Sequence, residues 1–132
     1  MQLSNFLRLV LKLDGASCLG LAALVLPTAS QLAGPLGIDA AALGAAAAAL
    51  IPIGLVIGWL GTRREAPASL IWLVIIGNGG WTLASLAAPA AWPTITPLGQ
   101  VAVAAQGLFV LAVAAAEWAG LRSSARAELV SA

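Results

Sequence analysis

The sequence lacks histidine and tyrosine, and it contains a single cysteine, Cys18. Without histidine there is no Ser-His-Asp or Cys-His catalytic unit and no imidazole ligand for a metal or a haem. One cysteine excludes an internal disulfide and a cysteine-rich metal site, and it is most simply a small buried apolar residue. The five acidic residues are scattered and form no recognisable metal motif. We therefore expect no metal, no other cofactor and no enzymatic activity.

Charge is also scarce. Only 8% of the 132 residues are charged, whereas a soluble domain carries about 25%. The net charge of +1 is too small for a surface that follows nucleic-acid phosphates. Hydrophobic residues make up 61% of the chain, and the mean hydropathy is +1.02. These values exclude a soluble domain, a disordered chain and a nucleic-acid binder, and they predict an integral protein of the lipid bilayer.

Long uncharged segments define the predicted membrane spans. No charged side chain occurs in residues 15–38, 40–62 or 66–116, and a helix needs about 20 apolar residues to cross the hydrocarbon layer. The third segment is long enough for two spans, and its prolines within 89–97 indicate a connection. No segment alternates polar and apolar residues, as a strand of a membrane barrel must. We predict one domain over residues 1–132, an all-α, four-helix transmembrane bundle running up-down-up-down, with spans at 5–32, 39–62, 67–88 and 97–121.

The basic residues predict the orientation. In this arrangement all six fall on one side of the membrane. They are Arg8, Lys12, Arg63, Arg64, Arg122 and Arg126. Cytoplasmic segments carry the excess of lysine and arginine, so we expect a multi-pass inner-membrane protein with both termini in the cytoplasm. Residues 1–30 have some features of a signal peptide, but Asp14 interrupts the boundary between its basic and apolar regions, and we expect no cleavage.

The two halves of the chain resemble one another. A shift of 62 residues places Pro27 on Pro89, and the pattern W-x-G-x-R occurs at 59–63 and at 118–122. One interpretation is two tandem helical hairpins, related by an axis along the membrane normal. The other is that unrelated helices share the usual aromatic and basic anchors at the interface.

Small residues recur four apart in three spans. Ala16 and Gly20 do so in the first, Gly54 and Gly58 in the second, and Ala112, Ala116 and Gly120 in the fourth. This spacing lets helix backbones approach closely in lipid. It fits packing within the bundle, or a contact with a second copy or another membrane protein.

Two acidic residues, Asp14 and Glu117, fall inside predicted spans, near the cytoplasmic side. An ionisable group in a span is costly and is a functional hypothesis by default. One interpretation is a layer of salt bridges with the basic residues at the membrane surface. The other is a pair of carboxylates that binds a proton or a cation. Asp39, by contrast, suits a helix N-cap.

Uncharged polar residues gather near mid-bilayer. Asn78, Trp81 and Ser85 share one face of the third span, because they recur at i, i+3 and i+7. Gln106 lies at a similar depth in the fourth span, on the same face as Glu117. The simpler interpretation is an Asn78–Gln106 hydrogen bond, worth about 0.6 to 2 kcal/mol. The alternative is a small polar pocket with Trp81 as one wall.

The polar positions together form one pattern. It consists of Asp14, Asn78-x-x-Trp81-x-x-x-Ser85, Gln106 and Glu117. This pattern resembles that of small bacterial four-span inner-membrane proteins of uncharacterised function, and the resemblance implies the fold and the location but no activity. The small multidrug resistance transporters are similar in size only. They carry a glutamate in the middle of the first helix, whereas Asp14 lies near its start, and their dual-topology members have balanced basic residues.

Two functions fit these features. The first is a non-enzymatic structural or accessory membrane component that packs against itself or a partner. The alternative is a small-solute or proton-coupled transporter with Asp14 and Glu117 as proton-binding carboxylates. Its substrate pocket would consist of Asn78, Trp81, Ser85 and Gln106.

Overall fold

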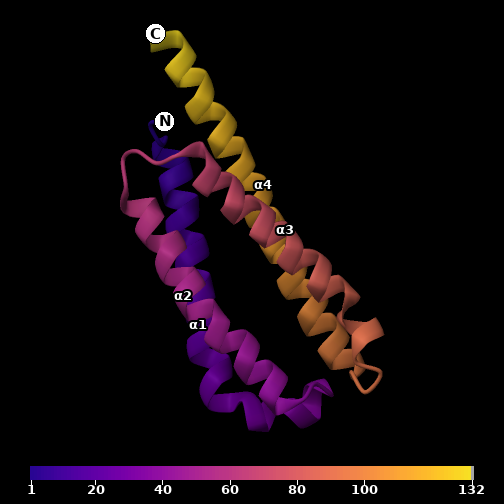
Figure 1. Ribbon diagram of the computed structural model, residues 1–132. Coiled ribbons are helices and arrows are strands. Elements are labelled where there is room, and N and C mark those ends of the chain that lie inside the picture. Colours follow the sequence, from indigo (N-terminus) through magenta and orange to yellow (C-terminus); the bar gives the residue numbers. More distant parts are fainter. Residues whose placement is uncertain (132) are drawn as a thin grey trace.

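The computed structural model describes residues 1–131 as four helices joined by short connections (Figure 1). They are α1 (Asn5–Leu36), α2 (Ala40–Thr62), α3 (Ala68–Ala91) and α4 (Pro97–Ser131). Each is long and apolar enough to cross a membrane. The predicted all-α, four-helix bundle is thereby confirmed, and the chain is a small multi-pass membrane protein.

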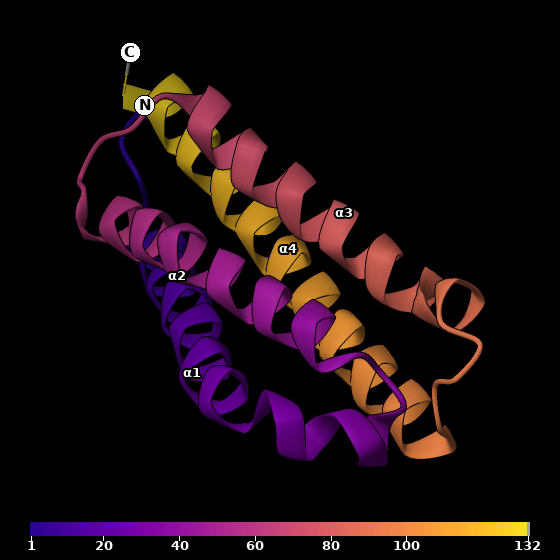
Figure 2. The ribbon, with the colours of Figure 1, turned by 60° about the horizontal axis from the view of Figure 1, so that its bottom comes forward.

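The end of α1 lies four residues beyond the predicted end at residue 32. Gly37 stops the helix in the left-handed conformation with φ 68°, which costs glycine little. The Ile38 N–H donates to the carbonyl of Ala33 and the Gly37 N–H to the carbonyl of Gly34, the hydrogen-bond pattern of a Schellman cap. The helix continues past Pro27 and bends in this second half (Figure 2). The stop signal in the sequence is therefore the glycine and not the prolines.

The other helix ends also follow local chemistry. Asp39 caps α2 as predicted, because its side chain accepts from two N–H groups of the first turn. α3 ends at Ala91, since the residue before a proline avoids the helical conformation and Trp92 precedes Pro93. α4 continues to Ser131, well beyond its predicted end.

The helices pack as two hairpins, α1 with α2 and α3 with α4, which meet along α1 and α4 (Figures 1 and 2). Within the described part of the chain, α2 and α3 do not pack against each other in this way. Gly15 of α1 lies against Gly54 and Gly58 of α2. A Cβ atom added to Gly15 would come within 2.5 Å of the Gly58 nitrogen. The glycine pair of α2 thus serves packing within the bundle.

The small residues of α4 divide between two environments. Gly120 packs against Leu7 of α1, where an added Cβ atom would lie 2.9 Å from the Leu7 Cβ atom. Ala116 is half-buried, and Ala112 is exposed. Only the last part of this ridge therefore faces the neighbouring helix.

Contacts between the hairpins close both ends of the bundle. At the end that holds the two termini, which we call the terminal end, the Ser4 N–H at the start of α1 donates to Ser124 Oγ of α4 at 2.9 Å. The core there includes Leu7, Leu11 and Ile71, all fully buried. At the opposite end, the Thr96 N–H donates to the carbonyl of Leu36 at 3.0 Å. The hairpins are therefore joined at both ends and separated between them on the α2–α3 side.

Candidate functional site

A hydrogen-bonded group of three side chains joins the two hairpins in the interior. Asn78 of α3 donates from Nδ2 to Asp14 Oδ2 of α1 at 2.9 Å and to Glu117 Oε2 of α4 at 3.1 Å. A side-chain amide nitrogen carries two hydrogens, so each carboxyl group can take one. The exposed fractions are 2% for Asp14, 8% for Asn78 and 0% for Glu117. We call Asp14 and Glu117 the acid pair; Asn78 holds them together.

The acid pair has acceptor capacity that these bonds do not use. Glu117 Oε1 is buried and has no hydrogen-bond partner among the described residues. Asp14 Oδ1 lies 3.9 Å from Cys18 Sγ, a weak donor. A buried acceptor without a donor is costly, and each such case in a native fold calls for an explanation. A proton on the pair, or a donor brought by a ligand, would supply what is missing.

The basic residues lie elsewhere. Arg63 stacks over Trp59 and Arg122 over Trp118, with 5.1 and 4.7 Å from guanidinium carbon to ring centroid. Arg8 donates weakly to a backbone carbonyl at 3.5 Å. Among the described residues, none of the hydrogen-bond partners of the acid pair is basic. The salt-bridge interpretation of the acid pair is therefore not realised. Arg122 is five residues from Glu117, outside the i+3 and i+4 spacings that face one another on a helix.

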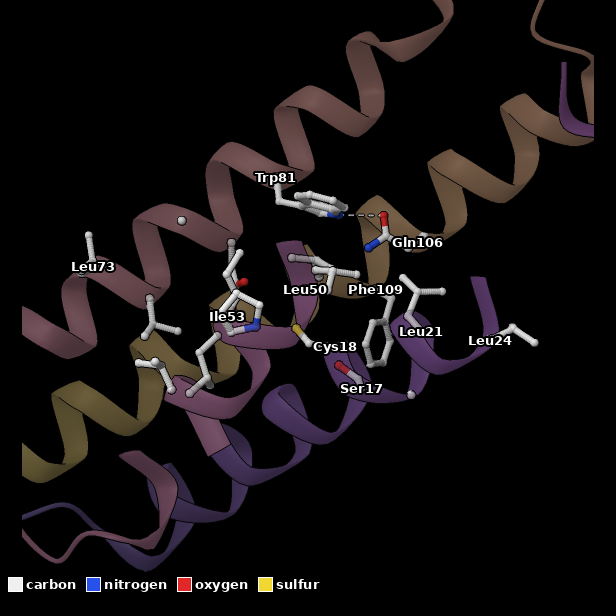
Figure 3. Close-up of a pocket in the computed structure, with 18 residues that line it drawn as sticks. Ser17, Cys18, Leu21, Leu24, Leu50, Ile53, Leu73, Trp81, Gln106 and Phe109 are labelled. Carbon is white, nitrogen blue, oxygen red and sulfur yellow. Dashed lines mark hydrogen bonds between the residues drawn. The ribbon is translucent and has the colours of Figure 1, made fainter. Parts of the chain in front are cut away.

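A second polar group lies one to two turns further along α3. Trp81 Nε1 donates to Gln106 Oε1 at 2.9 Å, and Ser85 Oγ lies 3.2 Å from the same oxygen (Figure 3). The expected Asn78–Gln106 hydrogen bond is not formed: Asn78 donates to the acid pair, and Gln106 accepts from Trp81 and Ser85 instead. The six polar residues that the sequence singled out thus form two groups of three.

Thr82 is a further interior residue, which the sequence reasoning missed. Its side chain is 3% exposed, and its Oγ1 lies 3.0 Å from the Asn78 carbonyl and 3.1 Å from the Gly107 carbonyl. It thereby links α3 to α4 beside Asn78. The only sequence signal is its i+4 spacing from Asn78, and threonine in a helix commonly bonds the carbonyl four residues earlier without further meaning.

A cavity of about 830 Å³ lies between the hairpins and is lined by residues of all four helices. This volume is in the range of small-molecule sites, about 300 to 1,000 Å³. Ser17, Cys18, Asn78, Trp81 and Gln106 contribute polar atoms, and the remaining lining is apolar or glycine (Figure 3). The acid pair lies directly behind Asn78 and Cys18, outside the lining itself.

Removing the Gln106 side-chain amide tests the second polar group. Gln106→Leu should lower the free energy of unfolding by about 1 kcal/mol, because hydrogen bonds between membrane helices are individually weak. It should also change the fluorescence of Trp81, whose indole loses its partner. Equilibrium unfolding in mixed micelles, with the exposed Gln100→Leu as control, measures the first effect. The double variant Gln106→Leu with Trp81→Phe should lose less unfolding free energy than the two single variants added together. Full additivity would show that the bond contributes nothing.

These features define a small multi-pass membrane protein with a polar interior site beside a cavity. A comparison with models of protein families, with curated proteins and with solved structures finds no match. The function is therefore argued from the site alone.

Proposed function

We propose that the protein is a proton-coupled small-solute transporter in which the acid pair binds the proton and the cavity binds the solute. One observation carries this proposal. Asp14 and Glu117 are buried in the interior beside a cavity, without a basic partner among the described residues. We also propose that it is not an enzyme, because its residue types offer no catalytic set.

Proton or cation binding follows from the electrostatics of the pair. Two unpaired negative charges in a low-dielectric interior are costly. One positive charge placed between them removes the repulsion and supplies the donor that Glu117 Oε1 lacks. Intramembrane carboxylates of this kind are typical of proton relays and ion pathways.

Coupling follows from the position of the pair at the interface of the hairpins. Asp14 belongs to the α1–α2 hairpin, whereas Asn78 and Glu117 belong to the α3–α4 hairpin. A change of charge on the pair therefore changes the contact between the hairpins. Fully buried leucines and Ile71 close the terminal end in the present state. Transport would alternate between this state and one in which the hairpins separate at that end.

The orientation that we propose follows the basic residues. Arg63 and Arg122 each stack on a tryptophan at the terminal end, and both chain termini lie at the same end (Figure 1). The positive-inside tendency then favours a cytoplasmic location for this end, in an inner membrane. Fusions of a topology reporter to residues 37–39 and to the C-terminus would test this orientation.

A second candidate is the structural or accessory role. The side between α2 and α3 is apolar and is not covered within the described chain, so a second copy or another membrane protein could pack there. Affinity purification in mild detergent distinguishes the two. A stoichiometric partner on this side would favour the accessory role, and a monomer that transports would exclude it.

The transport proposal is tested by proton flux in proteoliposomes. With an imposed pH gradient and an internal pH dye, the wild-type protein should dissipate the gradient faster than protein-free liposomes. An opposing gradient of a test solute, such as an alkylamine, an amino acid or a sugar, should change this rate for the accepted class. Asp14→Asn and Glu117→Gln should reduce the flux to the protein-free level.

Asp39→Asn is the matched control. It removes the same charge from a residue outside the cavity, and asparagine caps a helix as well as aspartate does. This variant should transport as the wild type does. Equal flux in all four proteins, or no flux above protein-free liposomes with any solute, would contradict the proposal.

A further inference from the structure

We infer that the cavity binds an amphiphilic amine, an apolar chain with one protonated amino group, which enters from the bilayer between α2 and α3. The inference rests on the proposed transport function and names its solute class. Three features carry it, namely the lining, the charge behind one end of the cavity and the open side.

The lining selects an apolar body. Leu21 and Leu50 point into the cavity beside Phe109, and most other lining residues are aliphatic or glycine (Figure 3). A solute with many hydroxyl groups would leave them without partners against this surface, which is costly. An alkyl or arylalkyl chain instead gains from burial, at about 25 cal/mol per Å² of apolar area.

The acid pair selects a cationic head. No lysine, arginine or histidine is among the lining residues. Asn78 and Cys18 form part of the wall, and the buried carboxyl groups of Asp14 and Glu117 lie directly behind them. The resulting negative potential attracts a cation and repels an anion. Asn78 and Cys18 separate the acid pair from the cavity, so the pair acts on the cationic head through its charge and not through a direct hydrogen bond.

The open side determines the route. Ile53 and Val56 of α2 and Leu73 of α3 line the cavity and are also exposed on the helix surface. The hairpins are joined by hydrogen bonds at both ends of the bundle, so the opening faces sideways. An amphiphile that has partitioned into the bilayer reaches the cavity through this opening without crossing either end.

Equilibrium binding to the full chain in phosphatidylcholine nanodiscs tests the inference. The probe is 11-bromoundecylamine, whose bromine quenches tryptophan at short range. Wild-type protein should show a saturable component of quenching that unbrominated undecylamine displaces and that Trp81→Phe removes. Glu117→Gln should raise the Kd about tenfold, equivalent to about 1.4 kcal/mol. Asp14→Asn should act in the same direction, and Asp39→Asn should bind as the wild type does.

The neutral probe 11-bromoundecanol provides the comparison of charge. It partitions into the same bilayer and keeps the apolar chain but carries no positive head, so its saturable component should have a Kd at least about tenfold higher than that of the amine. Equal saturable quenching by alcohol and amine, or an unchanged Kd in both acid-pair variants, would overturn the inference. Amine binding without proton flux would contradict the proposed transport function but support the amine site. Proton flux without amine binding would support the transport function but overturn the amine site.

Discussion

Replacing Asn78 with leucine should lower the free energy of unfolding by about 3 kcal/mol. The substitution removes two hydrogen bonds, one to each member of the acid pair, and leaves both carboxyl groups buried without a donor. Hydrogen bonds to charged groups contribute about 1.5 to 3 kcal/mol each. Two such bonds sum to about 3 to 6 kcal/mol. Bonds between membrane helices average nearer 0.6 kcal/mol each, so we expect a loss at the lower end of this sum. Unfolding titrations in mixed micelles would measure the loss.

Two variants make this expectation specific. Asn5→Leu changes the same residue type at an exposed position and should cost little. Glu117→Leu combined with Asn78→Leu should be less destabilising than the two single losses added, because the second substitution removes a group that the first leaves without a partner. An Asn78→Leu protein as stable as the Asn5→Leu protein would show that the amide does not hold the acid pair.

Replacing Gly15 with alanine should destabilise the protein by about 2 to 3 kcal/mol, in the upper part of the range for overpacking. The new Cβ atom would lie 2.5 Å from the Gly58 nitrogen and 2.7 Å from the Gly54 carbonyl oxygen. Both are backbone atoms, so no side-chain rotation relieves the contact and α1 must move away from α2. Since α1 carries Asp14, the same variant should also lose proton flux.

Alanine at two other glycines serves as the control. Gly20 is on the same helix with no atom within 4 Å of an added Cβ, and at Gly58 the nearest atom would lie 3.9 Å away. Gly20→Ala should be neutral or stabilising by up to about 1 kcal/mol, through the higher helix propensity of alanine. The G-x-x-x-G spacing alone predicts that Gly54 and Gly58 are equally sensitive. Equal loss in Gly15→Ala and Gly58→Ala would show that the α1–α2 contact is wrongly placed.

The sequence predicts the spans well, because uncharged segments and membrane thickness limit where helices can lie. It predicts their ends less well, since the ends depend on local caps. Asp39 was recognisable as a cap, but the stop at Gly37 depends on a left-handed residue that two nearby prolines obscured. The extension of α4 to Ser131 lies beyond the apolar segment, where hydropathy is uninformative.

The members of the site were predictable, and their pairing was not. Asp14, Asn78 and Glu117 stand out because polar groups are rare in an apolar chain. Which of them meet depends on the rotation of α1, α3 and α4 about their axes, and depth along the span does not determine it. The expectation of an Asn78–Gln106 bond came from matching depth alone. The cavity has no sequence signal, since its leucines and isoleucines are of the same type as lipid-facing residues.

The central claim is that Asn78 links Asp14 and Glu117 inside the bundle. Asn5 and Asn78 are the two asparagines of the chain, so selective ¹⁵N-asparagine labelling gives two side-chain amide groups in an NMR spectrum, with the exposed Asn5 as internal control. Asp14→Leu should shift one Asn78 amide proton and Glu117→Leu the other, while the Asn5 signals stay in place. Asn78 signals that neither substitution moves, or that exchange with water as fast as those of Asn5, would contradict the account.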